Sequence, residues 1–502
     1  MTPAENPNTP SEPSLTARVV KGGTWVFAGK IAGRGLTMVK ILVLARLLAP
    51  EDFGLFGIAM LAMATIGTFT KTGFDAALVQ RRDDARAHLD TAWTVQIIRG
   101  LVLAFLLFAA APLVGWFFEE PRAISLLRVL CLSKVVGAFK NIGIIYWRKE
   151  IEFHKQVIYS FATSFVTTAI GITLAFALRN VWALVWASLG GSITEIALSY
   201  VMHPYRPRIN WNTEQARELF GFGRWVLGSS VLIFFITHGD DAFLAKVLGV
   251  TALGIYQLAY RISNLAATEI THTLSSVLFP AYSKLQEDQP RFRNVYLRAL
   301  ATTLLFSAPM AAGTAAAAPL VVPVLLGPQW AASIVPIQIL AAYGFCRSWA
   351  ATVGPVFYAS GQPKEQTRVA VIQLVVLAIL IWPLTAAFRV PGTCLAVTMS
   401  MMTALLYSQK QVANILSCNA IQLLRSVGAP VVASAATGAV VSLLAYTLPA
   451  SAIALTIVVL VGIVAYAIFL PIFGAIIRPP VRLQLRSLIS VFKPSVGRAR
   501  AC

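Results

Sequence analysis

The chain has 502 residues, of which 57% are hydrophobic and only 12% charged, and its mean hydropathy is +0.72. A soluble domain carries roughly twice that share of charge, so the composition excludes an ordinary soluble protein and predicts a polytopic membrane protein. The net charge of +20 would suggest nucleic-acid binding in a soluble protein. Here the basic residues cluster in short gaps between apolar runs, so we expect a membrane protein with no nucleic-acid partner.

The chain opens on a polar segment rich in Pro, Ser and Thr, which predicts a disordered tail over residues 1–20. No basic stretch followed by an apolar one occurs there, so we expect no cleaved signal peptide. A spanning helix needs about 20 mostly apolar residues, and about fourteen such segments follow. The alternative is about twelve helices, if the last two segments are less regular. The predicted spans lie near 22–48, 54–79, 91–117, 124–147, 156–179, 181–203, 219–248, 253–279, 298–322, 331–358, 367–388, 391–414, 427–448 and 451–475.

Loop charge gives the orientation of these spans. With the N-terminus inside, about 25 basic residues fall in inner loops and about five in outer loops, the asymmetry expected of a membrane protein in its correct topology. The pattern predicts that both termini are cytoplasmic and that residues 477–502 form a basic cytoplasmic tail.

An internal repeat links two hairpins that lie two hundred residues apart. LARLLAPEDFGLFGIA at 44–59 and LAKVLGVTALGIYQLA at 244–259 share Leu, Ala, Leu, Gly and Ala at the same offset. Six spans fit within that offset, and an even number of helices returns the chain in the same orientation, so the copies are parallel. The repeat predicts two six-helix lobes, at 21–205 and 206–415, around a central cavity, with two additional helices at 416–476.

Basic residues also occur inside the predicted spans. Each costs around 2.5–3.5 kcal/mol at the centre of a membrane helix unless it is paired or hydrated, and the acids within the spans are too few to neutralise them. The surplus predicts a water-filled cationic cavity that receives an anion. The candidate anion-binding residues are Lys30, Arg34, Arg99, Arg261 and Arg347.

The repeat places Lys40 and Asp240 at equivalent positions, near the outer end of the first helix of each lobe. Opposite charges at pseudo-symmetric sites could meet when the outer side closes, which is our hypothesis of a gate pair; alternatively each pairs within its own lobe. Asp75, Asp240 and Glu269 are candidate sites of ion coupling, although Lys71 is four residues from Asp75 and could hold it ionised.

No motif in the sequence predicts a cofactor, a metal site or catalysis. The five cysteines have no metal-ligand spacing, and no nucleotide-binding motif occurs. We therefore expect a transporter without a cofactor, driven by an ion gradient or by the gradient of its substrate. A membrane glycosyltransferase or polymerase would need catalytic residues, usually on a sizeable outer loop, and the predicted outer loops are short.

Several short motifs resemble one known family. GFDAALVQRRD at 73–83, VLFPAYSKLQED at 277–288, LLGPQW at 325–330 and ASGQPK at 359–364, together with the first hairpin, are similar to bacterial polysaccharide exporters of the oligosaccharide flippase type. Their superfamily also includes multidrug antiporters and peptidoglycan-precursor flippases. The resemblance extends to about residue 415, and the last two helices match no motif of the family.

The resemblance implies translocation of undecaprenyl-pyrophosphate-linked oligosaccharide, such as an exopolysaccharide, capsule or O-antigen repeat unit, by alternating access. The bacterial cytoplasmic membrane is the implied location, and a polysaccharide polymerase and assembly proteins are further partners that the resemblance suggests. Lys30 and Arg34 match the place where such flippases carry first-helix cations. A peptidoglycan-precursor flippase and a multidrug antiporter of the same superfamily are the alternatives.

Overall fold

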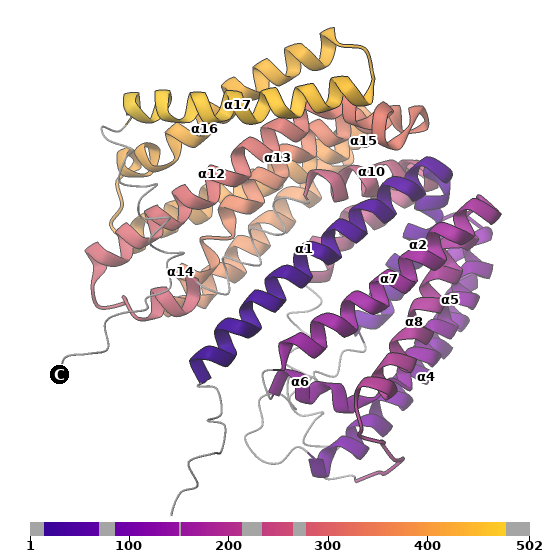
Figure 1. Ribbon diagram of the computed structural model, residues 1–502. Coiled ribbons are helices and arrows are strands. Elements are labelled where there is room, and N and C mark those ends of the chain that lie inside the picture. The colour runs from indigo at the N-terminus through magenta and orange to yellow at the C-terminus, as the bar shows by residue number, and fades with distance from the viewer. Residues whose placement is uncertain (1–14, 70–85, 150–151, 213–232, 265–277, 478–502) are drawn as a thin grey trace, which may run out of the picture. The chain divides into compact units, whose positions relative to one another are not determined.

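The computed structural model describes residues 15–69, 86–149, 152–212, 233–264 and 278–477. All regular structure in these ranges is helical (Figure 1). The chain divides into two compact units, which we name the N-unit (Met1–His238 with Ala245–Thr251) and the C-unit (Gly239–Leu244 with Ala252–Cys502).

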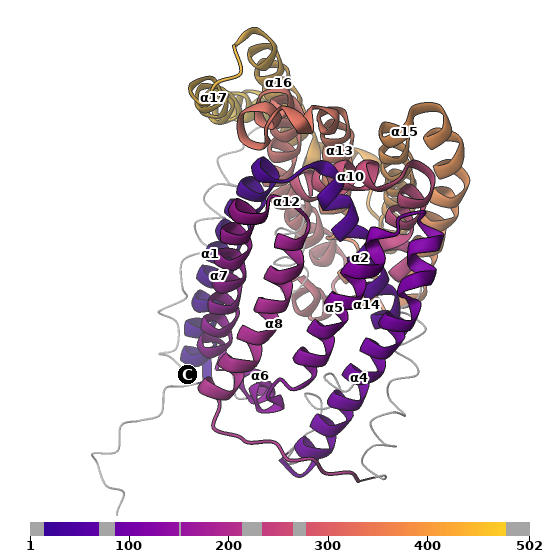
Figure 2. The same cartoon turned by 90° about the vertical axis from the view of Figure 1, so that its right-hand side faces the viewer.

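The N-unit contains six long helices in the described ranges (Figure 2). Helix α1 packs against α7, α7 against α8, α8 against α5, and α5 against both α4 and α2. Two short helical turns, η1 (Ile142–Ile145) and α6 (Tyr146–Lys149), follow α5. The long helices are α1 (Leu15–Leu47), α2 (Pro50–Phe69), α4 (Arg86–Phe117), α5 (Arg122–Ala138), α7 (Phe153–Leu178) and α8 (Trp182–Met202).

The fourth predicted span, near 124–147, is wrong at its C-terminal end because α5 stops at Ala138. Asn141 has extended backbone angles and caps η1, with its side chain accepting the N–H of Gly143 at 2.9 Å. The amide of Gln96 on α4 donates to the carbonyl oxygen of Ala138 at 2.8 Å. These polar side chains satisfy the backbone groups that a helix end leaves without partners.

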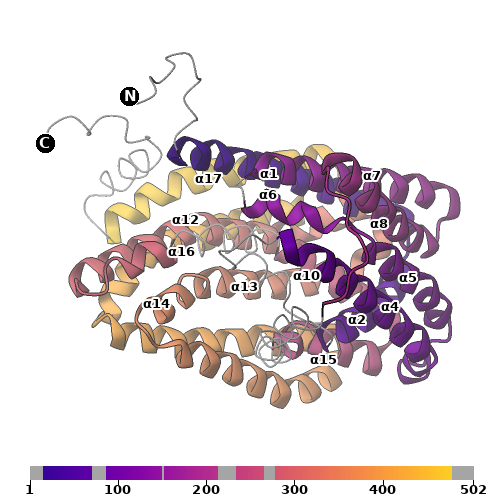
Figure 3. The same cartoon turned by 90° about the horizontal axis from the view of Figure 1, so that it is seen from below.

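The C-unit is built around α12 (Figure 3), which packs against α13, α16 and α17. Helix α13 packs in turn against α15, and α14 packs against α15. Trp330, Tyr296 and Phe357 are among its most deeply buried side chains. Its helices are α10 (Val250–Ser263), α12 (Gln289–Val321), α13 (Ile334–Ala350), α14 (Gly354–Ala359), α15 (Pro363–Ile415), α16 (Ala420–Thr447) and α17 (Ala452–Ile477), with turns η2 (Val322–Leu326) and η3 (Pro328–Ser333) after α12.

Helix α15 contains two of the predicted spans, 367–388 and 391–414. They meet at Arg389, whose backbone angles (φ 54°, ψ −133°) are not helical. Pro391 follows two residues later and cannot donate a backbone hydrogen bond, so a continuous α-helix is unfavourable there. The sequence therefore predicted this division correctly.

Within the described ranges, nine helices are long and apolar enough to cross a membrane. Large apolar side chains are exposed along them, for example Phe105 at 69% on α4 and Ile453 at 73% on α17. In a membrane these side chains face lipid, which is as apolar as they are. The chain is an all-helical, multi-pass membrane protein, as predicted; the count of about fourteen spans stays a prediction.

Most of the residues shared by the two repeated hairpins are buried packing residues; Leu248 is only half-buried. Leu44 and Ala45 before the first turn are 2% and 0% exposed, and Leu244 and Ala245 before the second are 0% and 1% exposed. Gly54 and Gly254 are likewise buried, as are Ala59 and Ala259. The internal repeat therefore retains the contacts that hold consecutive helices together.

Candidate functional site

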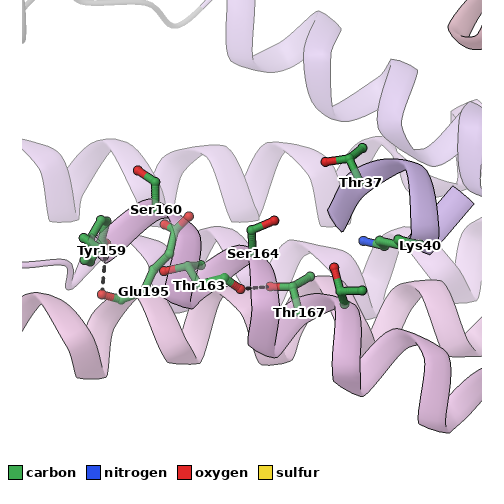
Figure 4. Close-up of a pocket in the computed structure, with 9 residues that line it drawn as sticks. Thr37, Lys40, Tyr159, Ser160, Thr163, Ser164, Thr167 and Glu195 are labelled. Atoms are coloured by element: carbon green, nitrogen blue, oxygen red, sulfur yellow. Dashed lines mark hydrogen bonds between the residues drawn. The ribbon is translucent and has the colours of Figure 1, made fainter. Parts of the chain in front are cut away.

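A polar cavity of about 320 Å³ lies within the N-unit, between α1, α7 and α8 (Figure 4). In hydrocarbon, unsatisfied hydroxyls and charges are costly, so a cavity with such walls is suited to water or a polar ligand. Six serine and threonine hydroxyls, one tyrosine, one lysine and one glutamate line it: Thr37, Lys40, Tyr159, Ser160, Thr163, Ser164, Thr167, Thr168 and Glu195.

Most of the lining comes from one face of α7. Five hydroxyl residues recur at i, i+3, i+4, i+7 and i+8 from Ser160, a spacing that gathers them on one side of a helix. On α7, Phe161 and Phe165 are 38% and 54% exposed, and their rings stack with centroids 6.5 Å apart. We name the first set, Ser160, Thr163, Ser164, Thr167 and Thr168, the α7 hydroxyl face.

Sequence reasoning missed the α7 hydroxyl face. The signal was present as serine and threonine at helical spacing within an otherwise apolar span. The candidate site residues were chosen among charged side chains instead, because a single charge changes the hydropathy of a span far more than a hydroxyl does.

Most of these hydroxyls make no hydrogen bond to another residue that the structure describes. Thr167 Oγ1 donates to the carbonyl oxygen of Thr163 at 2.8 Å, inside its own helix. The Oγ1 of Thr163 is buried and has no hydrogen-bond partner. Ser160, Ser164 and Thr168 likewise have none among the described residues. The hydroxyl face therefore offers unused donors and acceptors to whatever fills the cavity.

Two charged side chains stand at opposite ends of the cavity, Lys40 on α1 and Glu195 on α8 (Figure 4). The Glu195 carboxylate lies 4.0 Å from Lys140 Nζ, and its backbone carbonyl accepts a hydrogen bond from the Tyr159 hydroxyl at 3.0 Å. The structure thus places Lys40, the predicted gate residue, in a cavity of its own unit.

The other predicted cations of the N-unit are spread over two helices. Lys30 lies on α1, but its side chain is outside the described residues. Arg34, one turn before Thr37 on the same helix, is exposed. Arg99 is half-buried on α4, close enough to Lys134 on α5 for their charges to repel. The structure does not bring Arg99 into the cavity.

In the C-unit, two predicted site residues, Asp240 and Arg347, lie in one cluster. Asp240 is 5% exposed and accepts a hydrogen bond from the hydroxyl of Tyr256 on α10. One turn further, Tyr260 donates to the hydroxyl of Tyr343 on α13 at 3.3 Å. Arg347 Nη1 donates to the same Tyr260 hydroxyl at 3.4 Å.

The tyrosines connect these charges. The rings of Tyr256 and Tyr260 lie 6.1 Å apart, and those of Tyr260 and Tyr343 lie 5.6 Å apart. Arg261 is exposed beside Tyr260, and Asp241 attracts its charge. We name Asp240, Tyr256, Tyr260, Tyr343 and Arg347 the C-unit tyrosine cluster; it combines one buried acid with one arginine through phenol groups that sequence reasoning did not assign.

Two predicted ion-coupling residues, Asp75 and Glu269, lie outside the described residues, as does Lys71. The gate pair of Lys40 and Asp240 stays a prediction. Among the described residues, no group of three or more His, Cys, Asp or Glu side chains could hold a metal ion.

The sequence matches a family model over residues 43–335, more than half of the chain; its description is "Polysaccharide biosynthesis protein". A curated relative, the lipopolysaccharide biosynthesis protein WzxC of Escherichia coli (strain K12), is 25% identical over 70% of this chain and 71% of its own length. The succinoglycan biosynthesis transport protein ExoT of Rhizobium meliloti (strain 1021) is 23% identical over 64% of this chain and 65% of its own.

Among solved structures, the lipid II flippase MurJ in an inward closed conformation superposes with a TM-score of 0.71, covering 94% of this chain and 100% of that one at 17% identity. At that identity the likeness shows the fold alone. The resemblance predicted from the short motifs is confirmed by the family match and the relatives. The chain is a multi-pass membrane protein that belongs to the polysaccharide biosynthesis protein family.

Proposed function

We propose that this protein is a flippase, and not an enzyme, that moves undecaprenyl-pyrophosphate-linked oligosaccharide across the bacterial cytoplasmic membrane by alternating access. The observation that carries the proposal is the family match over residues 43–335. It is supported by relatives named for polysaccharide biosynthesis and transport and by a fold shared with a lipid II flippase. The cargo is an exopolysaccharide, capsule or O-antigen repeat unit.

A pyrophosphate is an anion that bears only hydrogen-bond acceptors at its oxygens, so lysine and arginine are its natural partners. We assign this role to Lys30, Arg34, Arg99, Arg261 and Arg347. The position of Arg347 supports its assignment, because the Tyr260 hydroxyl contacts its guanidinium at 3.4 Å and limits its movement. Arg34 and Arg261 have exposed side chains, as a ligand-binding cation requires.

We further propose how the helices are arranged in the membrane and which residues close the gate and couple transport to ions. Residues 21–205 and 206–415 form two lobes that rock, residues 416–476 add two helices, and both termini are cytoplasmic. Lys40 and Asp240 close the outer gate, and Asp75, Asp240 and Glu269 couple the cycle to ions. A polysaccharide polymerase and assembly proteins receive the translocated unit.

A second candidate is a peptidoglycan-precursor flippase, which the fold likeness to the lipid II flippase favours. Both functions move a sugar on the same class of lipid carrier, so the identity of the accumulated lipid decides between them.

The deciding experiment deletes the gene and analyses the lipid-linked sugars of the cytoplasmic membrane by mass spectrometry, with a leaflet-specific probe for exposed glycan. We expect an undecaprenyl-pyrophosphate oligosaccharide to accumulate on the inner leaflet, and the intact gene to remove it. Accumulation of lipid II instead would establish the alternative. Absence of any accumulated polyprenyl-linked sugar would overturn both.

A further inference from the structure

We propose that the cavity between α1, α7 and α8 is a saccharide subsite, which takes an uncharged sugar ring of the lipid-linked oligosaccharide apart from the cations that bind the pyrophosphate. This inference rests on the proposed function, since it assigns part of the same substrate to a separate place. The volume of the cavity, about 320 Å³, falls within the range of about 300–1,000 Å³ typical of small-ligand sites.

The first observation is the unpartnered hydroxyl of Thr163. This residue is 9% exposed, lines the cavity and has no hydrogen-bond partner for its Oγ1. A buried polar atom without a partner costs free energy, and such atoms in native proteins nearly always have one. A polar group inside the cavity would supply it.

The second observation is the mixture of donors and acceptors on the walls. Thr37 and Thr167 donate their hydroxyl protons to carbonyls of their own helices, those of Gly33 and Thr163, both at 2.8 Å. Only their lone pairs are left for a ligand, and the Glu195 carboxylate likewise only accepts. A ligand that fits these groups must bring hydrogen-bond donors.

A pyrophosphate fits this lining less well than a sugar does, because its oxygens only accept hydrogen bonds: Lys40 and the unpartnered hydroxyls could donate to them, but the Glu195 carboxylate would repel them. A sugar ring carries hydroxyls around its edge, and each donates one hydrogen bond and accepts others. It can donate to Glu195 and accept from the ammonium of Lys40 and from the hydroxyls of Ser164 and Thr168. The α7 hydroxyl face therefore matches a neutral polyol.

The test compares two lipids on the purified full-length protein in nanodiscs. The probes are undecaprenyl pyrophosphate without sugar and the undecaprenyl-pyrophosphate oligosaccharide extracted from the deletion strain, and dissociation constants are measured by native mass spectrometry. The variant Ser164→Ala/Thr168→Val removes two hydroxyls with little change of shape. The control is Thr194→Val on α8, whose hydroxyl donates to the carbonyl of Gly190 at 2.8 Å and lies outside the cavity lining.

We expect the double variant to bind the glycosylated lipid about tenfold more weakly, as two neutral hydrogen bonds are lost, and to bind the sugar-free lipid as the wild type does. Equal binding of the glycosylated lipid by the variant and the wild type would overturn the subsite. So would equal weakening of both lipids when the melting temperature is unchanged. If the double variant does not fold, Ser164→Ala alone is measured, with about a threefold weakening expected. Failure of the wild type to bind either lipid contradicts the proposed function itself.

Discussion

The carboxylate of Asp52 accepts the backbone N–H of Val181, 129 residues later in the chain, at 2.9 Å. Its other oxygen accepts the N–H of Ala49 at 3.0 Å. One side chain therefore satisfies backbone groups at the beginnings of both α2 and α8, where helices leave their first N–H groups without partners. The first repeated hairpin is thus attached to the beginning of α8.

Replacement of Asp52 by alanine removes both of these contacts. Hydrogen bonds to charged groups are worth about 1.5–3 kcal/mol each, and we expect Asp52→Ala to lower the free energy of unfolding by about 2 kcal/mol. Thermal unfolding in detergent, followed by intrinsic fluorescence, measures the change. Glu51→Gln is the control, because Glu51 is exposed and, among the described residues, its carboxylate bonds to the Arg122 side chain alone. Equal melting temperatures for the two variants would contradict the capping role.

The loop between α4 and α5 should make stability depend on pH. Arg122 donates to the carboxylate of Glu120 at 2.7 Å, which lowers the pKa of Glu120 below its usual range. A folded-state pKa below the unfolded one stabilises the protein above the unfolded pKa, and that stability is lost as pH falls through the lowered value. We expect Arg122→Gln to be less stable than the wild type at pH 7 and this difference to shrink below about pH 4.

The size of that effect is limited by the 58% exposure of the Arg122 side chain, so about 1 kcal/mol or less is expected at pH 7. Denaturant unfolding at pH 7 and at acidic pH measures it. The control is Arg298→Gln, because Arg298 is exposed and has no ion pair among the described residues. It should leave the denaturant-unfolding curves at pH 7 and at acidic pH unchanged. If the difference in unfolding free energy between the wild type and Arg122→Gln grew as the pH fell, the prediction would be contradicted.

Two glycines of α1 provide a matched test of helix packing. A methyl group at Gly29 would overlap Cγ1 of Val157 on α7, whereas a methyl group at Gly33 would meet no atom within 4 Å. Inserting atoms into a packed contact typically costs about 1–3 kcal/mol, so Gly29→Ala should lower the melting temperature and Gly33→Ala should not. The reverse order would show that α1 contacts α7 through its other face.

Asp240 offers a test of energy coupling. In Asp240→Asn the side-chain oxygen can still accept the Tyr256 hydroxyl, but the carboxyl proton is gone. If Asp240 couples transport to protons, translocation in proteoliposomes should no longer respond to an imposed proton gradient, while the melting temperature stays near that of the wild type. Tyr256→Phe removes the hydrogen bond and keeps the acid, so it should retain a gradient response. An undiminished response in Asp240→Asn would exclude this role.

Arg347 offers a test of anion binding. Arg347→Gln keeps a polar side chain but removes the charge. We expect polysaccharide export by the complemented deletion strain to fall about tenfold or more, as charged hydrogen bonds contribute about 1.5–3 kcal/mol. Arg425→Gln, at an exposed arginine of α16, is the control. Immunoblots of membranes must show equal protein levels. Normal export by Arg347→Gln would remove this residue from the pyrophosphate site.

The fold was predictable because membrane helices are determined mainly by the length of an apolar run. The same rule failed after Ala138, where Asn141 and Gln96 end a helix through long-range polar contacts that hydropathy does not register. The break at Arg389 was predictable because Pro391 lies beside it.

The candidate site was predictable only in part. Depth in the membrane selected Arg347 and the internal repeat selected Asp240. The structure brings the two into one cluster, but neither argument could reveal that tyrosines join them. The α7 hydroxyl face was missed because its residues become conspicuous only when the packing of α1, α7 and α8 turns them towards one cavity.

The burial of the shared hairpin residues has a consequence for how the two halves of this chain could diverge. Both hairpins keep leucine, alanine and glycine in contact with neighbouring helices, together with one basic residue, Arg46 in the first and Lys246 in the second. The acids Glu51 and Asp52 of the first hairpin have no acidic counterpart in the second. The shared packing residues thus give both halves the same helix arrangement, and the polar positions can change independently in each half. Lys40 in one half and Asp240 at the equivalent position of the other are an example. Two halves with the same packing can therefore carry different charges and take different roles.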